Sequence, residues 1–382
     1  MLRIFYFFIY ALTICVSSTA CATQQYELII DAGSSGSRIF LYEVYFNNNK
    51  VPFLNLLISK SITPGLSSFA ENPQAAISYL QSLLKQTDTT IRNFGIKPNQ
   101  LSVYLYATAG MRTLSVDKQN AIYDKLRHYF ATRGYSAYEV KTIDGRDEAI
   151  YDWLAVNYLS GTFINKTKSS GSLDMGGASA QISFETHDKL VPRGERVELD
   201  IAGTRYQLFA HSFLGLGSDL ALKNNTIAAC FPNGFEYKNK EVGAFDAQHC
   251  LDHIKTFLQE YHIKKTVPKI SMQMRFYAFS KYYYLARVYN ITQAPIPFVI
   301  NYVNNKFCSH YNWSEMQSYY PLTAPIYLNN QCFSSEFAYA LLKEFGFNDT
   351  ATNLEIVDTI NDVPIGWNIG AALARALKLH YQ

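Results

Sequence analysis

Two short segments of the sequence combine an aspartate with glycines and serines in a way that suits phosphate binding. The first, DAGSSGSR, runs from Asp31 to Arg38, and the second, DMGGASAQ, runs from Asp174 to Gln181. Tight turns of small residues point several backbone N–H groups at one place, where they can bind phosphate oxygens. Either turn alone is more often an ordinary hairpin with Asp and Gly in turn positions. Two of them together favour a polyphosphate site.

The aspartate that opens each segment indicates a divalent cation. A carboxylate repels phosphate, so Asp31 and Asp174 make sense if a cation lies between carboxylate and phosphate. Glu148 is a further acid of interest, in the stretch Gly145-Arg146-Asp147-Glu148-Ala149. At the start of a helix, two acids also serve simply to match the helix dipole, and these residues alone favour that role over a catalytic one. The histidines show no metal-ligand spacing, and no GxSxG, Walker lysine or HExxH motif occurs.

The elements that must position these residues repeat along the chain. Each aspartate–glycine turn is predicted to lie between two strands, which indicates an internal duplication at long spacing. The predicted strands cover 26–30, 39–46, 101–106 and 182–184, and the predicted helices cover 72–86, 147–159 and 369–379. Strands that alternate with helices predict an α/β protein. The duplication predicts two lobes with a cleft between them.

The first 22 residues are predicted to be a secretory signal peptide. Arg3 precedes the apolar run 4–16, and Ala20-Cys21-Ala22 is a small-residue cleavage site, with cleavage after Ala22. An uncleaved signal anchor is the alternative, although the run is short for a bilayer, and a lipidated Cys21 is less favoured. We therefore expect a secreted or periplasmic protein with no stable membrane span after cleavage.

Export gives the remaining cysteines a structural meaning. Four cysteines follow the leader, namely Cys230, Cys250, Cys308 and Cys332. An even number in an oxidising compartment predicts two disulfides, for which three connectivities exist. We favour neighbour pairing, Cys230 with Cys250 and Cys308 with Cys332, because it closes two modest loops. A zinc site is disfavoured because no C-x-x-C spacing occurs.

The composition is that of a packed globular protein. The 382 residues are 48% apolar and 17% charged, and the formal net charge is +3. This charge is too small to require nucleic acid or an acidic membrane as a partner. We expect the protein to be a monomer.

Five blocks in order resemble the conserved regions of the nucleoside triphosphate diphosphohydrolase, or apyrase, family. They are DAGSSGSR (31–38), YATAGMR (106–112), the helix start at 145–148, SLDMGGASAQISF (172–184) and the stretch 365–370. The connecting stretches PGLSSFAENP (64–73) and FLGLGSD (213–219) match as well. The resemblance covers nearly the whole chain after the leader, and is greatest to secreted bacterial members. It implies the actin-like, ribonuclease-H-type architecture of two α/β lobes with the active site between them.

The resemblance also implies a role for each matching residue. Glu148 matches the catalytic base, and Ser179 and Gln181 match the residues that hold the attacking water. Asp31 and Asp174 match carboxylates that hold Ca²⁺ or Mg²⁺ mostly through water, with Thr108 and Trp367 close by. The phosphate clamps match Ser34, Ser35, Gly36, Ser37, Ala109, Gly176, Gly177 and Ala178. The implied reaction is hydrolysis of terminal phosphates from nucleoside triphosphates, and we expect it to extend to diphosphates.

The nucleobase site departs from the family pattern. Tyr284, in FSKYYYLA (279–286), matches one aromatic that stacks on the base. The opposing aromatic normally lies just before Cys332, where this chain has 329–331 as Asn-Asn-Gln, so Tyr327 is the nearest candidate.

We expect lobe I to comprise 23–154 plus 359–382 and lobe II to comprise 155–358. An exopolyphosphatase of the same superfamily, which needs no base pocket, is the alternative enzyme.

Overall fold

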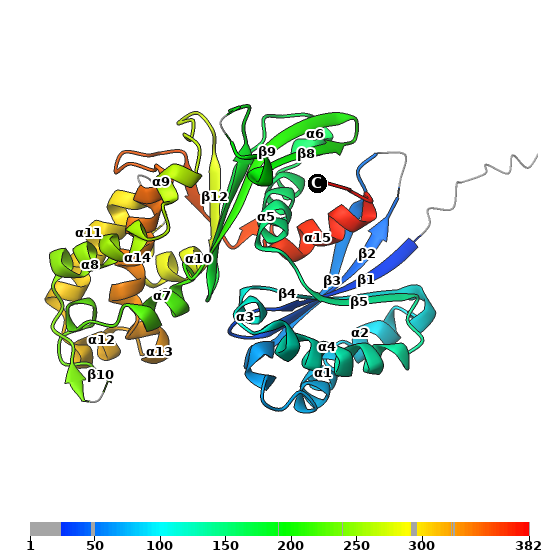
Figure 1. Ribbon diagram of the computed structural model, residues 1–382, viewed down its shortest axis with the longest axis horizontal. Helices are drawn as coiled ribbons and strands as arrows, with labels where there is room; N and C mark the ends of the chain where they lie inside the picture. Colours follow the sequence, from blue (N-terminus) through cyan, green and yellow to red (C-terminus); the bar gives the residue numbers. More distant parts are fainter. Residues whose placement is uncertain are drawn as a thin grey trace, which may run out of the picture.

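The computed structural model consists of two α/β lobes, each built on a mixed sheet (Figure 1). It describes residues 24–46, 50–189, 191–238, 240–291, 296–321, 323 and 325–381. The predicted signal peptide, residues 1–22, lies outside the described residues. Within the described part, no helix is long and apolar enough to cross a membrane.

The first sheet has the order β3-β2-β1-β4-β5. Its strands are β1 (Gln24–Ala32), β2 (Ser37–Tyr45), β3 (Phe53–Ile62), β4 (Leu101–Ala107) and β5 (Ala137–Thr142). Strand β1 pairs antiparallel with β2 and parallel with β4. Alternate residues of a strand face opposite sides of a sheet. Leu28 and Ile30 accordingly pack against α1 (Ala75–Lys85) and α4 (Val116–Ala131), while Ile29 faces the other lobe.

The second sheet has the order β13-β12-β6-β7-β9-β8. Its strands are β6 (Gly171–Met175), β7 (Ser179–Glu185), β8 (Arg196–Ile201), β9 (Thr204–Leu214), β12 (Phe276–Ser280) and β13 (Leu354–Ile356). Strand β6 pairs antiparallel with β7 and parallel with β12. This repeats the pairing of β1, so the predicted duplication is confirmed.

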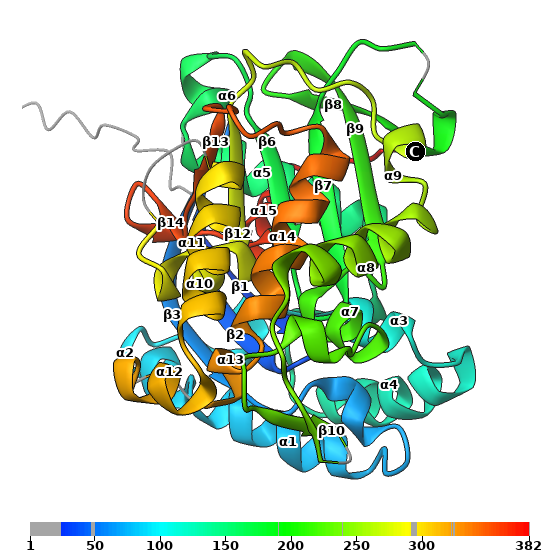
Figure 2. The ribbon, with the colours of Figure 1, turned by 90° about the vertical axis from the view of Figure 1, so that its left-hand side faces the viewer.

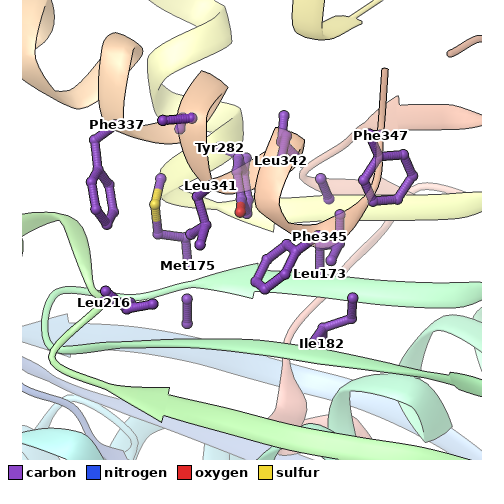
Figure 3. Close-up of a cluster of buried hydrophobic side chains, with 14 of the residues drawn as sticks. Leu173, Met175, Ile182, Leu216, Tyr282, Phe337, Leu341, Leu342, Phe345 and Phe347 are labelled. Atoms are coloured by element: carbon purple, nitrogen blue, oxygen red, sulfur yellow. The ribbon is translucent and has the colours of Figure 1, made fainter. Parts of the chain in front are cut away.

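Helices cover the outer face of the second sheet (Figure 2). They include α7 (Ser218–Asn224), α8 (Ala247–Gln259), α10 (Lys281–Val288), α11 (Ile296–His310) and α14 (Gln331–Phe345). Leu173 and Met175 of β6 pack on this side with Leu341 and Phe345 of α14 (Figure 3). The residue between them, Asp174, must therefore point to the opposite face.

Two helices fill the space between the sheets. They are α5 (Gly145–Leu159) and α15 (Trp367–Ala376), and they pack on each other and share one apolar core with both sheets (Figure 1). The expected lobe boundary at residue 154 falls inside α5, which also packs against β6, β7 and β9. The division into lobes at that residue therefore stays a prediction.

Shorter elements complete the chain. The remaining helices and strands are α2 (Asp88–Asn93), α3 (Ala109–Arg112), α6 (Thr162–Asn165), α9 (Ile263–Thr266), α12 (Trp313–Tyr319), α13 (Pro325–Leu328), β10 (Glu236–Lys238), β11 (Glu241–Val242), β14 (Thr359–Ile360) and β15 (Val363–Pro364). The C-terminal helix begins and ends earlier than the predicted 369–379. Lys378 has a φ of 52°, a left-handed conformation that a continuing helix does not allow.

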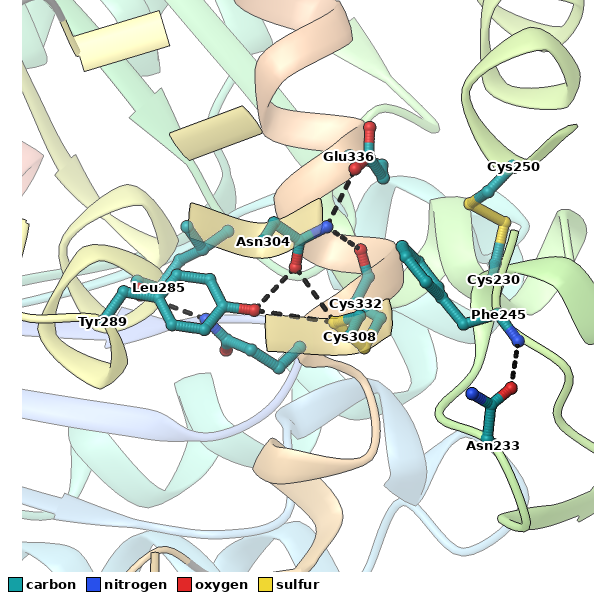
Figure 4. The surroundings of a disulfide bond; sticks show 11 residues. Cys230, Asn233, Phe245, Cys250, Leu285, Tyr289, Asn304, Cys308, Cys332 and Glu336 are labelled. Atoms are coloured by element: carbon teal, nitrogen blue, oxygen red, sulfur yellow. Dashed lines mark hydrogen bonds between the residues drawn. A yellow bond between two sulfur atoms is a disulfide. The ribbon is translucent and has the colours of Figure 1, made fainter. Parts of the chain in front are cut away.

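Both disulfides have the predicted connectivity (Figure 4). Cys230 is bonded to Cys250 of α8, and Cys308 of α11 is bonded to Cys332 of α14. Beside the second bond, the Asn304 amide donates to the Cys332 carbonyl at 3.1 Å and to Glu336 Oε1 at 2.9 Å. The Tyr289 hydroxyl donates to Asn304 Oδ1 at 2.6 Å. This buried polar network joins α10, α11 and α14.

Glu336 of this network makes stability depend on pH. Burial raises the pKa of Glu336 to about 7, although the Asn304 amide and Lys255 oppose the shift. The folded protein holds this proton more tightly than the unfolded chain does. The contribution of Glu336 to the free energy of unfolding is therefore fully present below the unfolded pKa, near 4.5, and is lost as the pH rises through 7.

We therefore predict that Glu336→Gln reduces the loss of stability between pH 5 and pH 8. The expected reduction is about 1–3 kcal/mol, the free energy of a shift of this size. Urea unfolding curves at both pH values measure it, and Glu260→Gln, an exposed acid of the same lobe, is the control. An unchanged pH dependence in Glu336→Gln would contradict the assignment.

Candidate active site

The two aspartate–glycine turns face each other across a cleft of about 420 Å³. Most predicted site residues line this cleft, namely Asp31, Ser34, Ser35, Thr108, Ala109, Glu148, Asp174, Gly176, Gly177, Ala178, Ser179, Tyr284 and Trp367. Gln181 lies buried directly behind Ser179 and Glu148. Gly36 and Ser37 lie at the base of the first turn, where Gly36 packs against the backbone of Ile62 and Ser37 is buried.

Asp31 is placed at the end of β1, where the first turn begins. In the β-ladder it lies opposite Arg38, whose Nη1 is 3.3 Å from Asp31 Oδ2. Burial raises the pKa of Asp31, and the Arg38 charge and hydrogen bond oppose that shift. The other oxygen, Oδ1, is buried and accepts no hydrogen bond from any residue that the structure describes.

Asp174 occupies the equivalent place in the second sheet. It lies opposite Gln181 in the β6–β7 ladder, on the face that α5 covers. Burial raises the pKa of Asp174 to about 7, and a hydrogen bond from the Ser280 side chain opposes the shift. Like Asp31, it has one buried oxygen, Oδ1, with no hydrogen-bond donor in the described part of the chain.

These unpartnered carboxylate oxygens fit a hydrated cation. Buried carboxylates need compensation, and hard divalent cations prefer oxygen ligands and keep several waters. Among the described residues, no three His, Cys, Asp or Glu side chains lie close enough to hold a metal ion directly. The residues therefore fit a cation that Asp31 and Asp174 hold largely through water. Thr108 and Trp367 line the same cleft.

Glu148 lies in the first turn of α5, which Asp144 caps by accepting from the Arg146 N–H at 2.9 Å. Its Oε2 accepts from Arg112 Nη2 at 2.8 Å and from Gln181 Nε2 at 3.1 Å. Burial raises the pKa of Glu148, while the Arg112 charge and hydrogen bond lower it. A carboxylate whose pKa is raised toward neutrality is a stronger base that is still ionised at working pH.

The side-chain amide of Gln181 connects Glu148 to the second turn. Its Nε2 lies 2.7 Å from Ser179 Oγ and 2.9 Å from Ser212 Oγ, in addition to its contact with Glu148. An amide nitrogen carries two protons, so one of them is shared among these acceptors. Glu148, Ser179 and Gln181, predicted from separate motifs, thus form one hydrogen-bonded group.

Arg112 belongs to this group and was missed by the sequence analysis. Its Nη2 donates to Glu148 and also to Ser179 Oγ at 3.2 Å, while Nη1 donates to the Ile143 carbonyl at 3.2 Å. The signal was present, because Arg112 ends the YATAGMR block at the C-terminus of α3. Its role depends on a contact between residues 36 positions apart, which the motif does not show.

Glycines of the connecting stretches hold both turns in place. A methyl group at Gly65 would collide with the backbone carbonyl of Ser34, and one at Gly110 would collide with the Ser34 Cα. A methyl group at Gly217 would likewise collide with the backbone nitrogen of Ala178. Each turn therefore packs directly on another backbone segment, which leaves no room for a side chain there.

One of the two tyrosines predicted to bind the nucleobase lines the cleft. Tyr284 is 56% exposed and lines the cleft together with its neighbour Tyr283. Tyr327 belongs to α13, but its side chain lies outside the described residues, so its role stays a prediction. Lys281 Nζ, also in the cleft, is 2.9 Å from Asp219 Oδ1.

A larger hollow, of about 690 Å³, lies elsewhere, among residues such as Ser160, Lys168 and Arg275. None of the unpartnered buried polar atoms in the described structure belongs to its lining. Chemistry, rather than size, therefore identifies the cleft between the turns as the candidate active site.

The model of the GDA1/CD39 (nucleoside phosphatase) family matches residues 18–233 and 234–381. The chain belongs to this family. The predicted resemblance is thus confirmed, and so is the prediction that the protein is an enzyme of the nucleoside phosphatase type. Among relatives, "Probable apyrase 5" of Arabidopsis thaliana is 26% identical over 92% of this chain and 82% of its own length.

Solved structures confirm the predicted fold class. A nucleoside triphosphate hydrolase of Neospora caninum superposes with a TM-score of 0.66 at 15% identity, over 93% of both chains. A Ppx/GppA family member of Aquifex aeolicus superposes with a TM-score of 0.58 at 15% identity, over 93% of this chain and 98% of its own. At such identities the likeness concerns the two-lobed actin-like fold alone.

For this nucleoside phosphatase family member, we predict that Gly65→Ala displaces the first turn and lowers kcat/KM for nucleotide by about 10²-fold. Misplacement of a positioning group by about 1 Å has effects of this size. Steady-state phosphate release measures the change. Gly194→Ala is the matched control, because a methyl group there meets no neighbour. Equal activity of the two variants would contradict the packing argument.

Proposed function

We propose that this protein is a divalent-metal-dependent hydrolase that removes the terminal phosphate of nucleoside triphosphates and of diphosphates. The observation that carries the proposal is the buried group Glu148–Gln181–Ser179, which lies between two phosphate-binding turns. No serine, cysteine or histidine nucleophile is needed, because phosphoryl transfer depends mainly on positioning and electrostatics.

In the proposed reaction, Ser179 and Gln181 hold a water molecule in line with the terminal phosphorus. Glu148 takes one proton from this water as its oxygen attacks phosphorus. The bond from phosphorus to the bridging oxygen breaks, and its electrons stay with the leaving nucleotide. The products are inorganic phosphate and a nucleotide with one phosphate fewer, and Glu148 then returns its proton to solvent.

The turns stabilise the charge that moves during this step. Backbone N–H groups and hydroxyls of the first turn, with Ala109, bind one end of the phosphate chain, and Gly176, Gly177 and Ala178 bind the other. Asp31 and Asp174 would hold Ca²⁺ or Mg²⁺, which when bound neutralises phosphate charge and fixes the orientation of the chain. Preorganised donors aimed at developing charge provide a large share of catalysis.

An exopolyphosphatase is the competing enzyme, since the Ppx/GppA fold is similar. The family match and the exposed aromatic pair Tyr283 and Tyr284 beside the cleft favour a nucleotide. Faster release of phosphate from inorganic polyphosphate than from ATP would support the competitor.

We also propose that the enzyme acts outside the cytoplasm as a monomer. The leader sequence and the two disulfides support export, because disulfides persist in oxidising compartments. Substrates in that setting are free nucleotides, not nucleic acid.

The central prediction concerns the base. Glu148→Gln should lower kcat for ATP by about 10²–10⁴-fold, the usual scale for loss of a general base, while the wild type should lose activity in chelator. Phosphate release with Ca²⁺, with Mg²⁺ and with EDTA measures both effects. Glu198→Gln, an exposed acid on β8, is the control. Full activity of Glu148→Gln, or of the wild type in chelator, would overturn the mechanism.

A second prediction concerns Arg112 and the pH profile. Arg112 lowers the pKa of Glu148, so Arg112→Gln should raise that pKa and move the acidic limb of kcat/KM to higher pH. Arg112→Lys keeps the charge and should move the limb less. Profiles between pH 5 and pH 9 measure the shift, with exposed Arg92→Gln as the control. A limb that moves to lower pH or stays in place would show that Arg112 does not tune the base.

A further inference from the structure

Asp152 is a buried acid that the proposed mechanism does not use. It lies one helical turn after Glu148 on α5 and is 0% exposed. Neither of its carboxylate oxygens has a hydrogen-bond donor among the described residues. A buried carboxyl group without partners is costly whether ionised or neutral, because a neutral one also needs a donor and an acceptor. Something other than the described protein atoms must therefore satisfy it.

The position of Asp152 relates it to the cleft. Residues four apart lie on the same face of a helix, so Asp152 shares the face that carries Glu148. The negative charges of Asp174, Glu148 and Asp31, the acids of the candidate active site, all raise the pKa of Asp152, and Asp174 has the largest effect of the three.

The unpartnered atoms therefore gather in one region. Asp31 Oδ1, Asp174 Oδ1 and both oxygens of Asp152 have no hydrogen-bond partner among the described residues. Buried polar atoms that lack protein partners are normally satisfied by ordered water. A hydrated cation brings several such waters, with their protons directed outward.

Charge balance supports the same conclusion. Of the four acids, Asp31 is paired with Arg38 and Glu148 with Arg112. Asp152 and Asp174 have no such ion pair among the described residues. A cation beside these two acids would supply the positive charge that no described side chain provides.

We propose that Asp152 is a third carboxylate of the cation site, which accepts hydrogen bonds from the cation's water shell on the side of α5. The inference rests on the proposed function, since it takes the cation from there. Asp152 touches neither the phosphate nor the attacking water, and it acts as a positioning residue. Carboxylates that bind the waters or ligands of a metal ion typically change metal affinity by about 10–100-fold when they are removed.

The test measures cation binding rather than activity. The full-length secreted protein is titrated with Mn²⁺, and free Mn²⁺ is read from its electron paramagnetic resonance signal, with and without a non-hydrolysable ATP analogue. Asp152→Asn should bind Mn²⁺ about 10–100-fold more weakly than the wild type. In chelator its melting temperature should equal or exceed that of the wild type, because an uncompensated buried acid is gone.

Two further variants separate the possible outcomes. Asp147→Asn, on the same helix but beside Asp144, Lys141 and Arg146, is the matched control and should bind Mn²⁺ as the wild type does. Asp174→Asn should weaken binding strongly. Wild-type-like Mn²⁺ affinity in Asp152→Asn, with weak binding in Asp174→Asn, would overturn this inference and leave the proposed function intact.

The other outcomes are also decisive. If the wild type binds no Mn²⁺, or if Asp174→Asn binds it as well as the wild type does, the cation part of the proposed function fails and this inference fails with it. If Asp152→Asn and Asp152→Ala both unfold in chelator, Asp152 is a structural group and the inference is wrong.

Discussion

The burial of several acids in one place is the constraint on which this structure depends. Asp31, Asp174, Glu148 and Asp152 are each 6% exposed or less. The charges of Asp31 and Glu148 raise the pKa values of both Asp174 and Asp152. Like charges in a poorly hydrated region repel strongly, and two arginines offset only part of that repulsion. The folded protein must therefore hold these groups against their own electrostatics, and this cost makes the cleft a place where a cation is stabilising.

The apolar core between the sheets holds these acids in place. It joins β1, β2 and β4 of one sheet to β8 and β9 of the other through α5 and α15, and contains side chains such as Trp153 and Leu373. Close-packed cores of this kind have few voids and low compressibility, so the elements packed in them move little relative to one another. Because α5 is buried along most of its length, its first turn cannot move away from Asp31 and Asp174. Glu148 is thus fixed by packing well outside the cleft.

The two turns and the group around Glu148 have different parts in the proposed activity. The glycine turns would bind phosphate, which is a requirement that kinases and chaperones of an actin-like fold share. The hydrogen-bonded group of Glu148, Arg112, Ser179 and Gln181 would supply the base beside one turn. Glycines pack each turn against a second backbone segment and so fix the position of the turns relative to this group.

The sequence by itself predicted the fold class, the duplicated hairpins and two disulfides, and it favoured the pairing that the structure has. These features depend on local patterns, because strand alternation, turn glycines and cysteine parity can be interpreted one segment at a time. Most of the cleft residues were predicted from the family resemblance. Leu173, Asp174 and Met175 show this well, since their alternation alone sends the acid to the face opposite the core. The family resemblance, rather than the spacing, assigned Glu148 its role.

Only the tertiary structure decided which groups, distant in the sequence, form ion pairs or hydrogen bonds with each other. Arg112 and Glu148 come from different helices, and Asp152 looks like an ordinary polar position of α5 until the sheets enclose it. Gly65 likewise packs against Ser34, and Gly217 against Ala178, so each contact joins two segments that are far apart in the chain. Burial and long-range electrostatics are properties of the packed molecule, so no local pattern contains them.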